Sequence, residues 1–340
     1  MQFASDYQEG AHPAILERLV QTNLEQTAGY GLDPHSERAR ELIRAACGTP
    51  SADVQFLMGG TQANAVVIDA LLRPWQGVVA AESGHVSVHE AGAIEFTGHK
   101  VMTLPGRLGK ITAEQVDALA LDWERDENRE HMVQPGMIYV SQPTEYGTLY
   151  SLAELEALAE TCRAHDLLLY VDGARLAYAL AAPENDVALP DLGRLCHAFY
   201  LGGTKCGALF GEAVVIPDPQ LAPRFFTQVK QHGALLAKGR IAGIQFEVLF
   251  EDGLYQRIGV PAIRTSERIR AALTAAGYEL YFDSPTNQTY FLVDDEQLER
   301  IGRVAAYSYG ERVPDGRAAI RFATSWATRD ADVDRLIKLL

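Results

Sequence analysis

The sequence predicts an α/β protein, in which helices flank a mostly parallel central sheet and a smaller α+β domain follows at the C-terminal end. Helical and strand-like segments alternate as far as Gly253, which is the arrangement that parallel strands with helical crossovers require. Residues 167–171 form a continuous apolar run, which is typical of a central strand covered on both faces. The 340 residues also exceed the roughly 250–300 that a single hydrophobic core usually holds. We therefore expect a large domain of residues 1–253 and a small domain of residues 254–340.

Local signals predict the elements of the large domain. Short apolar runs bounded by turn residues predict strands at 54–58, 78–82, 137–141, 167–171, 197–203 and 212–217. Apolar residues at helical spacing predict helices at 36–47, 63–71, 113–121 and after Ser151. Two of these helices begin with a capping pair, Thr112 with Gln115 and Ser151 with Glu154.

The small domain is predicted from a change of pattern near residues 250–260. A helix at 262–276 ends at Gly277, and a helix near 295–305 and a closing amphipathic helix follow further along. Strands are expected at 278–282, 289–293 and 318–324.

Composition excludes several classes of function. The 30 basic and 45 acidic residues give a net charge of −15 without a basic block, so binding to nucleic acid or to an anionic membrane is not expected. The four cysteines have no C-x-x-C spacing, which excludes zinc-knuckle and thioredoxin-type sites, and no metal site is expected. Scattered cysteines, the absence of a signal peptide at the N-terminus and the lack of a long apolar segment predict a cytoplasmic protein.

Two motifs lie where strands end and could bind a charged ligand. Residues 59–64 (GGTQAN) join a strand to a helix, and glycines at a helix N-terminus let backbone N–H groups approach an anion; the alternative is an ordinary turn. Asp172 follows the strand 167–171, at the edge where open α/β sheets bind ligands, and could hold a protonated ring nitrogen. The alternative for Asp172 is a helix N-cap.

Three further residues could take part in catalysis or binding. Lys205 follows a buried strand between small residues and could form a Schiff base with an aldehyde, unless it is a surface lysine in a turn. The flat ring of His85 could stack on a heterocycle, although a lone histidine is often structural. Arg321 lies inside an apolar strand and needs a carboxylate partner, from the protein or from a ligand. Together these residues supply what pyridoxal phosphate and an amino-acid substrate need.

On these residues the sequence resembles the low-specificity L-threonine aldolases, which are fold-type I pyridoxal-phosphate enzymes of the aromatic β-eliminating lyase group. The match covers nearly the whole chain and includes Ser5-Asp6, Tyr30-Gly31, Asp33-Pro34, Gly60–Asn64, His85, Glu90–Gly92, Asp172–Arg175, Thr204-Lys205 and Arg321. The resemblance implies that Lys205 carries the cofactor as a Schiff base, that Asp172 binds its ring nitrogen and that His85 stacks on its ring. It also implies that Gly60 and Thr61 bind the phosphate and that Ser5, Arg175 and Arg321 bind the substrate carboxylate.

The sequence departs from the family pattern at three places. Thr204 replaces the usual serine before the lysine. Glu145 replaces a histidine that is common in the family, so the group that takes the proton of the substrate's β-hydroxyl could be His85, Glu145 or water. The phosphate-binding arginine of the family has no clean counterpart, and Lys238 or Arg240 could replace it.

The function implied by this resemblance is retro-aldol cleavage of β-hydroxy-α-amino acids, of the L-threonine, L-allo-threonine or phenylserine type, to glycine and an aldehyde. The alternatives are another β-eliminating lyase or an aminotransferase on the same scaffold, or a binding protein without cofactor. The family also implies a homo-oligomer, a dimer of dimers with sites at the subunit interface.

Overall fold

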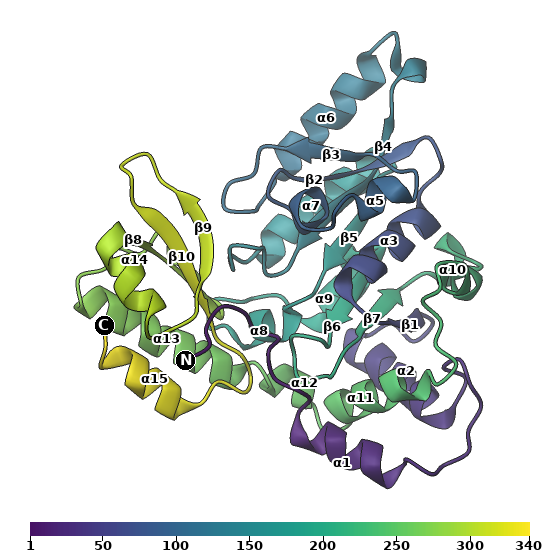
Figure 1. Ribbon diagram of the computed structural model, residues 1–340. Helices are drawn as coiled ribbons and strands as arrows, with labels where there is room; N and C mark the ends of the chain where they lie inside the picture. The colour runs from purple at the N-terminus through teal and green to yellow at the C-terminus, as the bar shows by residue number, and fades with distance from the viewer.

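A mixed sheet of seven strands forms the centre of the larger part of the molecule (Figure 1). The computed structural model describes residues 1–340. The strands lie in the order β1-β7-β6-β5-β4-β2-β3, and β7 is antiparallel to both of its neighbours while the other pairings are parallel. Their bounds are β1 Asp53–Leu57, β2 Gln76–Ala81, β3 Val101–Leu104, β4 Gln134–Ser141, β5 Leu168–Asp172, β6 Ala198–Gly202 and β7 Glu212–Ile216. The predicted α/β fold with a mostly parallel sheet is confirmed.

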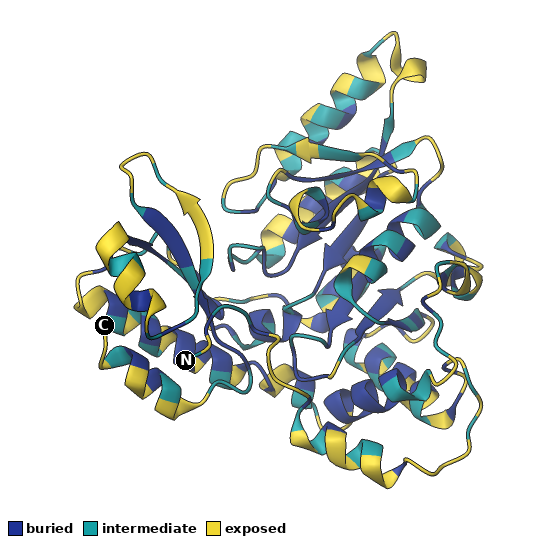
Figure 2. Cartoon of the chain, viewed as in Figure 1, coloured by how far each residue is buried: buried dark blue, intermediate teal, exposed yellow.

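Helices cover both faces of this sheet, because alternate residues of each strand enter two different hydrophobic cores. Against one face pack α2 Pro34–Cys47, α6 Ala113–Arg125, α7 Leu152–Ala164, α8 Leu176–Ala181, α9 Leu189–Leu195 and α11 Arg240–Glu251. Against the other face pack α3 Gly60–Leu71, α4 His85–Val88, α5 Ala93–Phe96 and α10 Phe225–Gln231. Figure 2 shows the sheet as a buried layer between helices whose outer sides are exposed. Tyr139, Tyr170 and Tyr200 come from neighbouring strands and all belong to the core on the α3 side.

The smaller part of the molecule is an antiparallel sheet with helices on it. Its strands are β8 Gln288–Val293, β9 Ser308–Arg312 and β10 Ala318–Ala323, in the order β8-β10-β9, and its helices are α13 Val260–Ala275, α14 Asp295–Gly302 and α15 Asp330–Ile337. The remaining helices are α1 Pro13–Gln21, α12 Leu254–Arg257 and two 3-10 turns at Arg129–His131 and Pro219–Leu221.

The N-terminal segment connects the two parts. Phe3 lies in the core of the smaller part, where its N–H donates to Ala306 O at 3.1 Å and its carbonyl accepts from Ala323 N at 2.8 Å. From there the purple segment in Figure 1 runs past α8 to α1, along the junction of the two parts. The division into two domains at residue 253 stays a prediction. The first residues of the chain pack with the smaller part of the molecule, which also contains the last residues.

Most predicted elements are present, with small shifts at their ends. Both predicted capping boxes form, at Thr112 and at Ser151. The strand predicted at 278–282 is absent, and a single bridge between Leu280 and Phe291 takes its place. The helix α11 was not predicted, because it is buried on nearly every side and so shows no polar face. None of the helices is long and apolar enough to cross a membrane.

Candidate active site

The carboxyl ends of β4, β5 and β6 meet the N-terminus of α3, and most of the predicted site residues lie at this edge of the sheet. Asp172 is the last residue of β5 and Ser141 is the last residue of β4. Lys205 follows β6. The topology therefore brings together residues that are far apart in the sequence, as expected for ligand sites in open α/β sheets.

The carboxylate of Asp172 accepts hydrogen bonds from several elements. Its Oδ1 accepts from Tyr200 Oη at 2.5 Å and from Ala174 N at 2.9 Å. Its Oδ2 accepts from Tyr139 Oη at 2.6 Å and from Asn64 Nδ2 at 3.1 Å. Burial would raise the pKa of Asp172, but the hydrogen bonds from Tyr139 and Tyr200 outweigh burial and hold the pKa below its ordinary value. Asp172 is thus a buried group that stays negatively charged, which is what a protonated ring nitrogen needs.

Lys205 lies in a turn that hydrogen bonds fix to the start of β7. The N–H groups of Gly203 and Thr204 donate to Gly211 O at 2.9 and 3.1 Å, and Gly211 N donates to Thr204 Oγ1 at 3.0 Å. Burial, together with the charge of Arg175, lowers the pKa of the Lys205 amine below its usual value. The amine makes no ion pair and no hydrogen bond with the protein, so it is available for reaction with an aldehyde.

Glu212 lies beneath this turn and was not singled out from the sequence. Its Oε2 accepts from Gly203 N at 3.0 Å, and the residue is buried. Burial raises the pKa of Glu212 to about 7, although the charge of Lys205 opposes the shift.

His85 begins α4 and is held by two carboxylates. Its Nδ1 lies 2.7 Å from Glu90 Oε1, and its backbone N–H donates to Glu145 Oε1 at 2.9 Å. The ring is partly exposed, and no protein atom bonds its Nε2. One ring nitrogen is thus fixed and the other is available to a ligand.

Glu145 lies next to His85 and accepts a second hydrogen bond at the same oxygen. Ser141 Oγ donates to Glu145 Oε1 at 2.8 Å. Burial and the negative charge of Asp172 raise the pKa of Glu145 against the effect of these hydrogen bonds. A carboxylate with a raised pKa is a stronger base than an exposed one, so Glu145 is a better proton acceptor than an ordinary glutamate.

The N-terminus of α3 provides the anion cradle that the sequence predicts. Gly59 caps the helix without a side-chain hydrogen bond, so the first N–H groups of α3 are free to bind an anion. A Cβ atom at Gly60 would come within 3.1 Å of Tyr200 Oη, so a larger residue would crowd the cradle. Thr61 is exposed and lines a cleft of about 710 Å³ with Gln62, Glu90 and His232.

The two cations considered for the phosphate differ in their surroundings. Arg240 donates hydrogen bonds to the carbonyl oxygens of Thr22, Asn23 and Glu25 at 2.9 to 3.1 Å, so it closes the loop before α2. Lys238 is exposed, and its side chain makes no hydrogen bond or ion pair. The structure thus gives Arg240 a structural role and leaves Lys238 unengaged.

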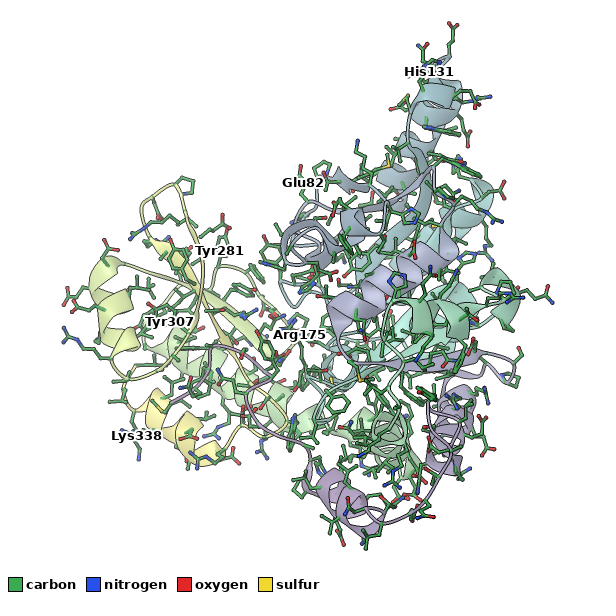
Figure 3. All side chains as sticks on the ribbon, turned by 45° about the vertical axis from the view of Figure 1, so that its right-hand side comes forward. Glu82, His131, Arg175, Tyr281, Tyr307 and Lys338 are labelled. Carbon is green, nitrogen blue, oxygen red and sulfur yellow. The ribbon has the colours of Figure 1, made fainter.

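The predicted carboxylate-binding arginines lie where the two parts of the molecule meet, as Figure 3 shows for Arg175. Arg175 Nε and Nη2 donate to the two carboxylate oxygens of Asp6 at 2.7 and 3.0 Å, which leaves Nη1 free. Asn287, in the loop just before β8, donates from its side-chain Nδ2 to the same Asp6 at 2.8 Å. Ser5 precedes this aspartate and makes no side-chain hydrogen bond.

Arg321 has donors that the protein does not satisfy. It donates to Gln288 Oε1 at 2.7 Å, to Ala4 O at 3.1 Å and to Ser308 Oγ at 3.2 Å, but to no carboxylate. Its Nε and the Nε2 of Gln288 are buried without any partner. Buried donors without partners cost free energy, so the protein alone does not satisfy this pair of side chains.

The residues present fit pyridoxal phosphate. The free amine of Lys205 suits its aldehyde, the charged Asp172 suits its ring nitrogen, and the α3 N-terminus suits its phosphate. No group of three or more His, Cys, Asp or Glu residues has the geometry to hold a metal ion.

Comparison with known proteins agrees with this site. The sequence profile of the family described as beta-eliminating lyase matches residues 2–295. A low-specificity L-threonine aldolase from a Pseudomonas species is 30% identical over 98% of this chain and 95% of its own length. The chain belongs to the β-eliminating lyase family, among the threonine aldolases. This lyase also superposes on a threonine aldolase from Leishmania major with a TM-score of 0.96 and 40% identity, over 99% of this chain and 98% of that one.

A more distant structure shows how widely the fold is shared. An aspartate aminotransferase from Thermus thermophilus has a TM-score of 0.72 at 17% identity, over 99% of this chain and 90% of that one, which shows a common fold alone. The predicted family, the fold-type I architecture and the dependence on pyridoxal phosphate are confirmed. The protein is a pyridoxal-phosphate-dependent lyase.

Several residues of the site were not assigned roles from the sequence. They are Asp6, Asn64, Glu90, Tyr139, Tyr200, Glu212, Asn287 and Gln288. Tyr139 and Tyr200 had a usable signal, since each is a polar aromatic residue inside a strand adjacent to the strand that ends in Asp172. Asp6, Asn64 and Glu90 lie in segments that resemble the threonine aldolases, which was a second signal. Glu212, Asn287 and Gln288 could not be found without knowing which elements meet.

Proposed function

We propose that this lyase cleaves the Cα–Cβ bond of β-hydroxy-α-amino acids, of the L-threonine, L-allo-threonine or phenylserine type, to give glycine and an aldehyde. The observation that carries the proposal is the placing of Glu145 beside His85, near the buried carboxylate of Asp172. Retro-aldol cleavage needs an acceptor for the β-hydroxyl proton, and transamination does not. The relatives named as threonine aldolases support the same substrate class.

Each part of the cofactor has a residue to hold it. Lys205 would bind it covalently, with Thr204 fixing the turn, and Asp172 would pair with its ring nitrogen. The ring of His85 would stack on it, and Gly60 and Thr61 would bind its phosphate. When bound, pyridoxal phosphate supplies an aldehyde that amines attack and a ring that accepts electrons. The cation for the phosphate is proposed to be Lys238, since Arg240 is engaged with carbonyl groups.

The substrate carboxylate is proposed to bind between Arg175 and Arg321. Arg175 keeps Nη1 free while Asp6 holds the rest of its guanidinium in place. Arg321 keeps Nε free, and Gln288 fixes its Nη1. Ser5 can add a hydroxyl donor from the N-terminal segment. Holding the carboxylate at two points fixes the orientation of the Cα–Cβ bond, which is a large part of the rate.

Glu145 is proposed to take the proton of the β-hydroxyl group. Its Oε1 is occupied by hydrogen bonds from Ser141 and His85, and its Oε2 has no protein partner. Burial raises the pKa of Glu145, which makes it a better base at neutral pH. His85 Nε2, which also has no protein partner, is the other acceptor that this proton can reach.

Two other proposals follow from the resemblance. We propose a homo-oligomer, a dimer of dimers with sites at the subunit interface, in the cytoplasm. All four cysteines are free and buried, which suits a reducing compartment.

Product analysis tests the proposed reaction. The holoenzyme is incubated separately with threonine, allo-threonine, phenylserine and alanine, and glycine and aldehyde are quantified. Equal amounts of glycine and aldehyde from the β-hydroxy substrates, with no reaction of alanine, are expected. If a keto acid forms instead, the protein is an aminotransferase; formation of ammonia and a 2-keto acid from threonine would indicate β-elimination.

A further inference from the structure

A buried network of side chains connects His85 to Asp172. Glu90 Oε1 lies 2.7 Å from His85 Nδ1 and accepts from Asn64 Nδ2, also at 2.7 Å. The same Nδ2 donates its second hydrogen to Asp172 Oδ2 at 3.1 Å. Asn64 Oδ1 accepts from Tyr170 Oη at 2.8 Å. The amide of Asn64 therefore lies between two carboxylates, of which one contacts the histidine and the other would hold the cofactor ring.

The hydrogen bonds of Asn64 define its orientation. Both amide hydrogens go to carboxylates and the amide oxygen goes to a phenol, and the residue is fully buried. The reversed amide would place its oxygen against Glu90 and Asp172, where no hydrogen is available. Asn64 thus fixes where Glu90 Oε1 lies.

Glu90 in turn defines the hydrogen on the His85 ring. Its Oε1 accepts from Asn64 and is closest to His85 Nδ1, so the short contact is a hydrogen bond if Nδ1 carries the hydrogen. We propose that Glu90 and Asn64 are positioning residues that keep the hydrogen of His85 on Nδ1, so that Nε2 is the nitrogen that meets the substrate's β-hydroxyl group. The proposal rests on the proposed function, and it adds the residues that act through His85.

The second oxygen of Glu90 argues against a purely structural role. Glu90 Oε2 is buried and has no hydrogen-bond partner, although a buried charged group is costly unless it is satisfied. Such local conflicts are expected at functional sites.

The tautomer of His85 tests the proposal directly. The full-length holoenzyme, labelled with ¹⁵N-histidine and free of substrate, is studied by NMR, with His85→Gln used to assign the signal. We expect His85 to carry its hydrogen on Nδ1 whenever the ring is neutral. A ring with its hydrogen on Nε2 would overturn the proposal without any need for a variant at Glu90.

Two variants of similar size then separate positioning from packing. Glu90→Gln keeps an acceptor oxygen for both donors, while Glu90→Met fills the same space without an acceptor. Glu95→Met, at an exposed position of the nearby α5, is the control for loss of a glutamate. We expect Glu90→Gln to keep the Nδ1 tautomer, and Glu90→Met to lose it and to lower kcat by at least roughly tenfold, with KM changed less.

The outcomes separate this proposal from the proposed function. If Glu90→Met keeps the Nδ1 tautomer and the kcat of the wild type, the positioning role is wrong. If Glu90→Met does not fold, the tautomer of His85 in the wild type and in Glu90→Gln still tests the positioning role. If the wild type has the Nδ1 tautomer but cleaves no β-hydroxy amino acid, the proposed function fails and the positioning of His85 stands.

Discussion

The hydroxyl group of Tyr200 lies 2.5 Å from Oδ1 of Asp172 and donates a hydrogen bond to it. Tyr139 does the same at Oδ2, from the strand on the other side of β5. Neutral phenols on both sides stabilise the carboxylate without adding a positive charge, so Asp172 remains the counter-charge for a ring nitrogen.

Removal of the Tyr200 hydroxyl group is expected to destabilise the protein. Tyr200→Phe should lower the free energy of unfolding by about 2 kcal/mol, because a hydrogen bond to a buried charge is lost. Tyr255→Phe is the matched control, since the Tyr255 hydroxyl is equally buried but has no partner. Urea unfolding of the two variants at pH 7.5 checks this. Equal loss in both would show that the hydroxyl of Tyr200 contributes nothing through Asp172.

The pKa of Glu212 predicts a pH-dependent stability. Burial raises the pKa of Glu212 from its ordinary value of 4.5 to about 7 in the folded protein, so the folded state binds this proton more tightly than the unfolded state does. The stability contributed by the protonated form is therefore full below pH 4.5 and is lost as the pH rises to about 7. Glu212→Gln should remove this loss.

The measurement is unfolding of the wild type and of Glu212→Gln at pH 4.5 and pH 8. The quantity compared is the free energy of unfolding of the variant minus that of the wild type. This difference should be more favourable to the variant at pH 8 than at pH 4.5 by on the order of 3 kcal/mol, since each pKa unit corresponds to about 1.4 kcal/mol. Gln keeps an oxygen for the N–H of Gly203. A difference that does not change with pH would contradict the raised pKa.

Arg321→Ala should raise KM and lower kcat while the absorbance of the bound cofactor stays unchanged. Arg321 is proposed to contact the substrate alone, and a misoriented substrate reacts slowly as well as binding weakly. Steady-state kinetics and an absorbance spectrum of the same preparation check both statements. Loss of cofactor or unfolding would show that Arg321 serves to hold Ala4 and Gln288 together.

Glu145→Gln should strongly reduce cleavage of β-hydroxy amino acids and should spare exchange of the α-proton of glycine. The amide keeps shape and hydrogen bonding, but it cannot accept the hydroxyl proton. Cleavage rates and deuterium exchange into glycine are measured in the same variant. A parallel decline of both rates would mean that Glu145 orders the site and that His85 or water is the base.

The sequence allowed the fold, and the positions of Asp172 and Lys205 at strand ends, to be predicted, because both depend on local patterns. The apolar run before Asp172 and the small residues around Lys205 identify strand ends at one edge of the sheet. The network around His85 could not be predicted in this way. Asn64 and Glu90 are 26 positions apart and meet because α3 and the loop after α4 cover the same face of the sheet.

Some sequence signals were also ambiguous. Arg321 was expected to need a carboxylate, and the structure gives it an amide, a hydroxyl and a carbonyl instead. Arg240 has the charge that a phosphate requires, but three carbonyl groups of a distant loop occupy its guanidinium. The charge of a residue can be read from sequence, whereas its partners depend on tertiary contacts.

The most direct test of the account is Lys205→Ala. The absorbance of the bound cofactor and the rate of cleavage are measured side by side with the wild type. We predict that the imine absorbance disappears and that cleavage falls below roughly one part in a hundred of the wild-type rate, since covalent catalysis contributes more than this. An intact imine band, or activity above that level, would contradict the assignment of Lys205 as the residue that binds the cofactor.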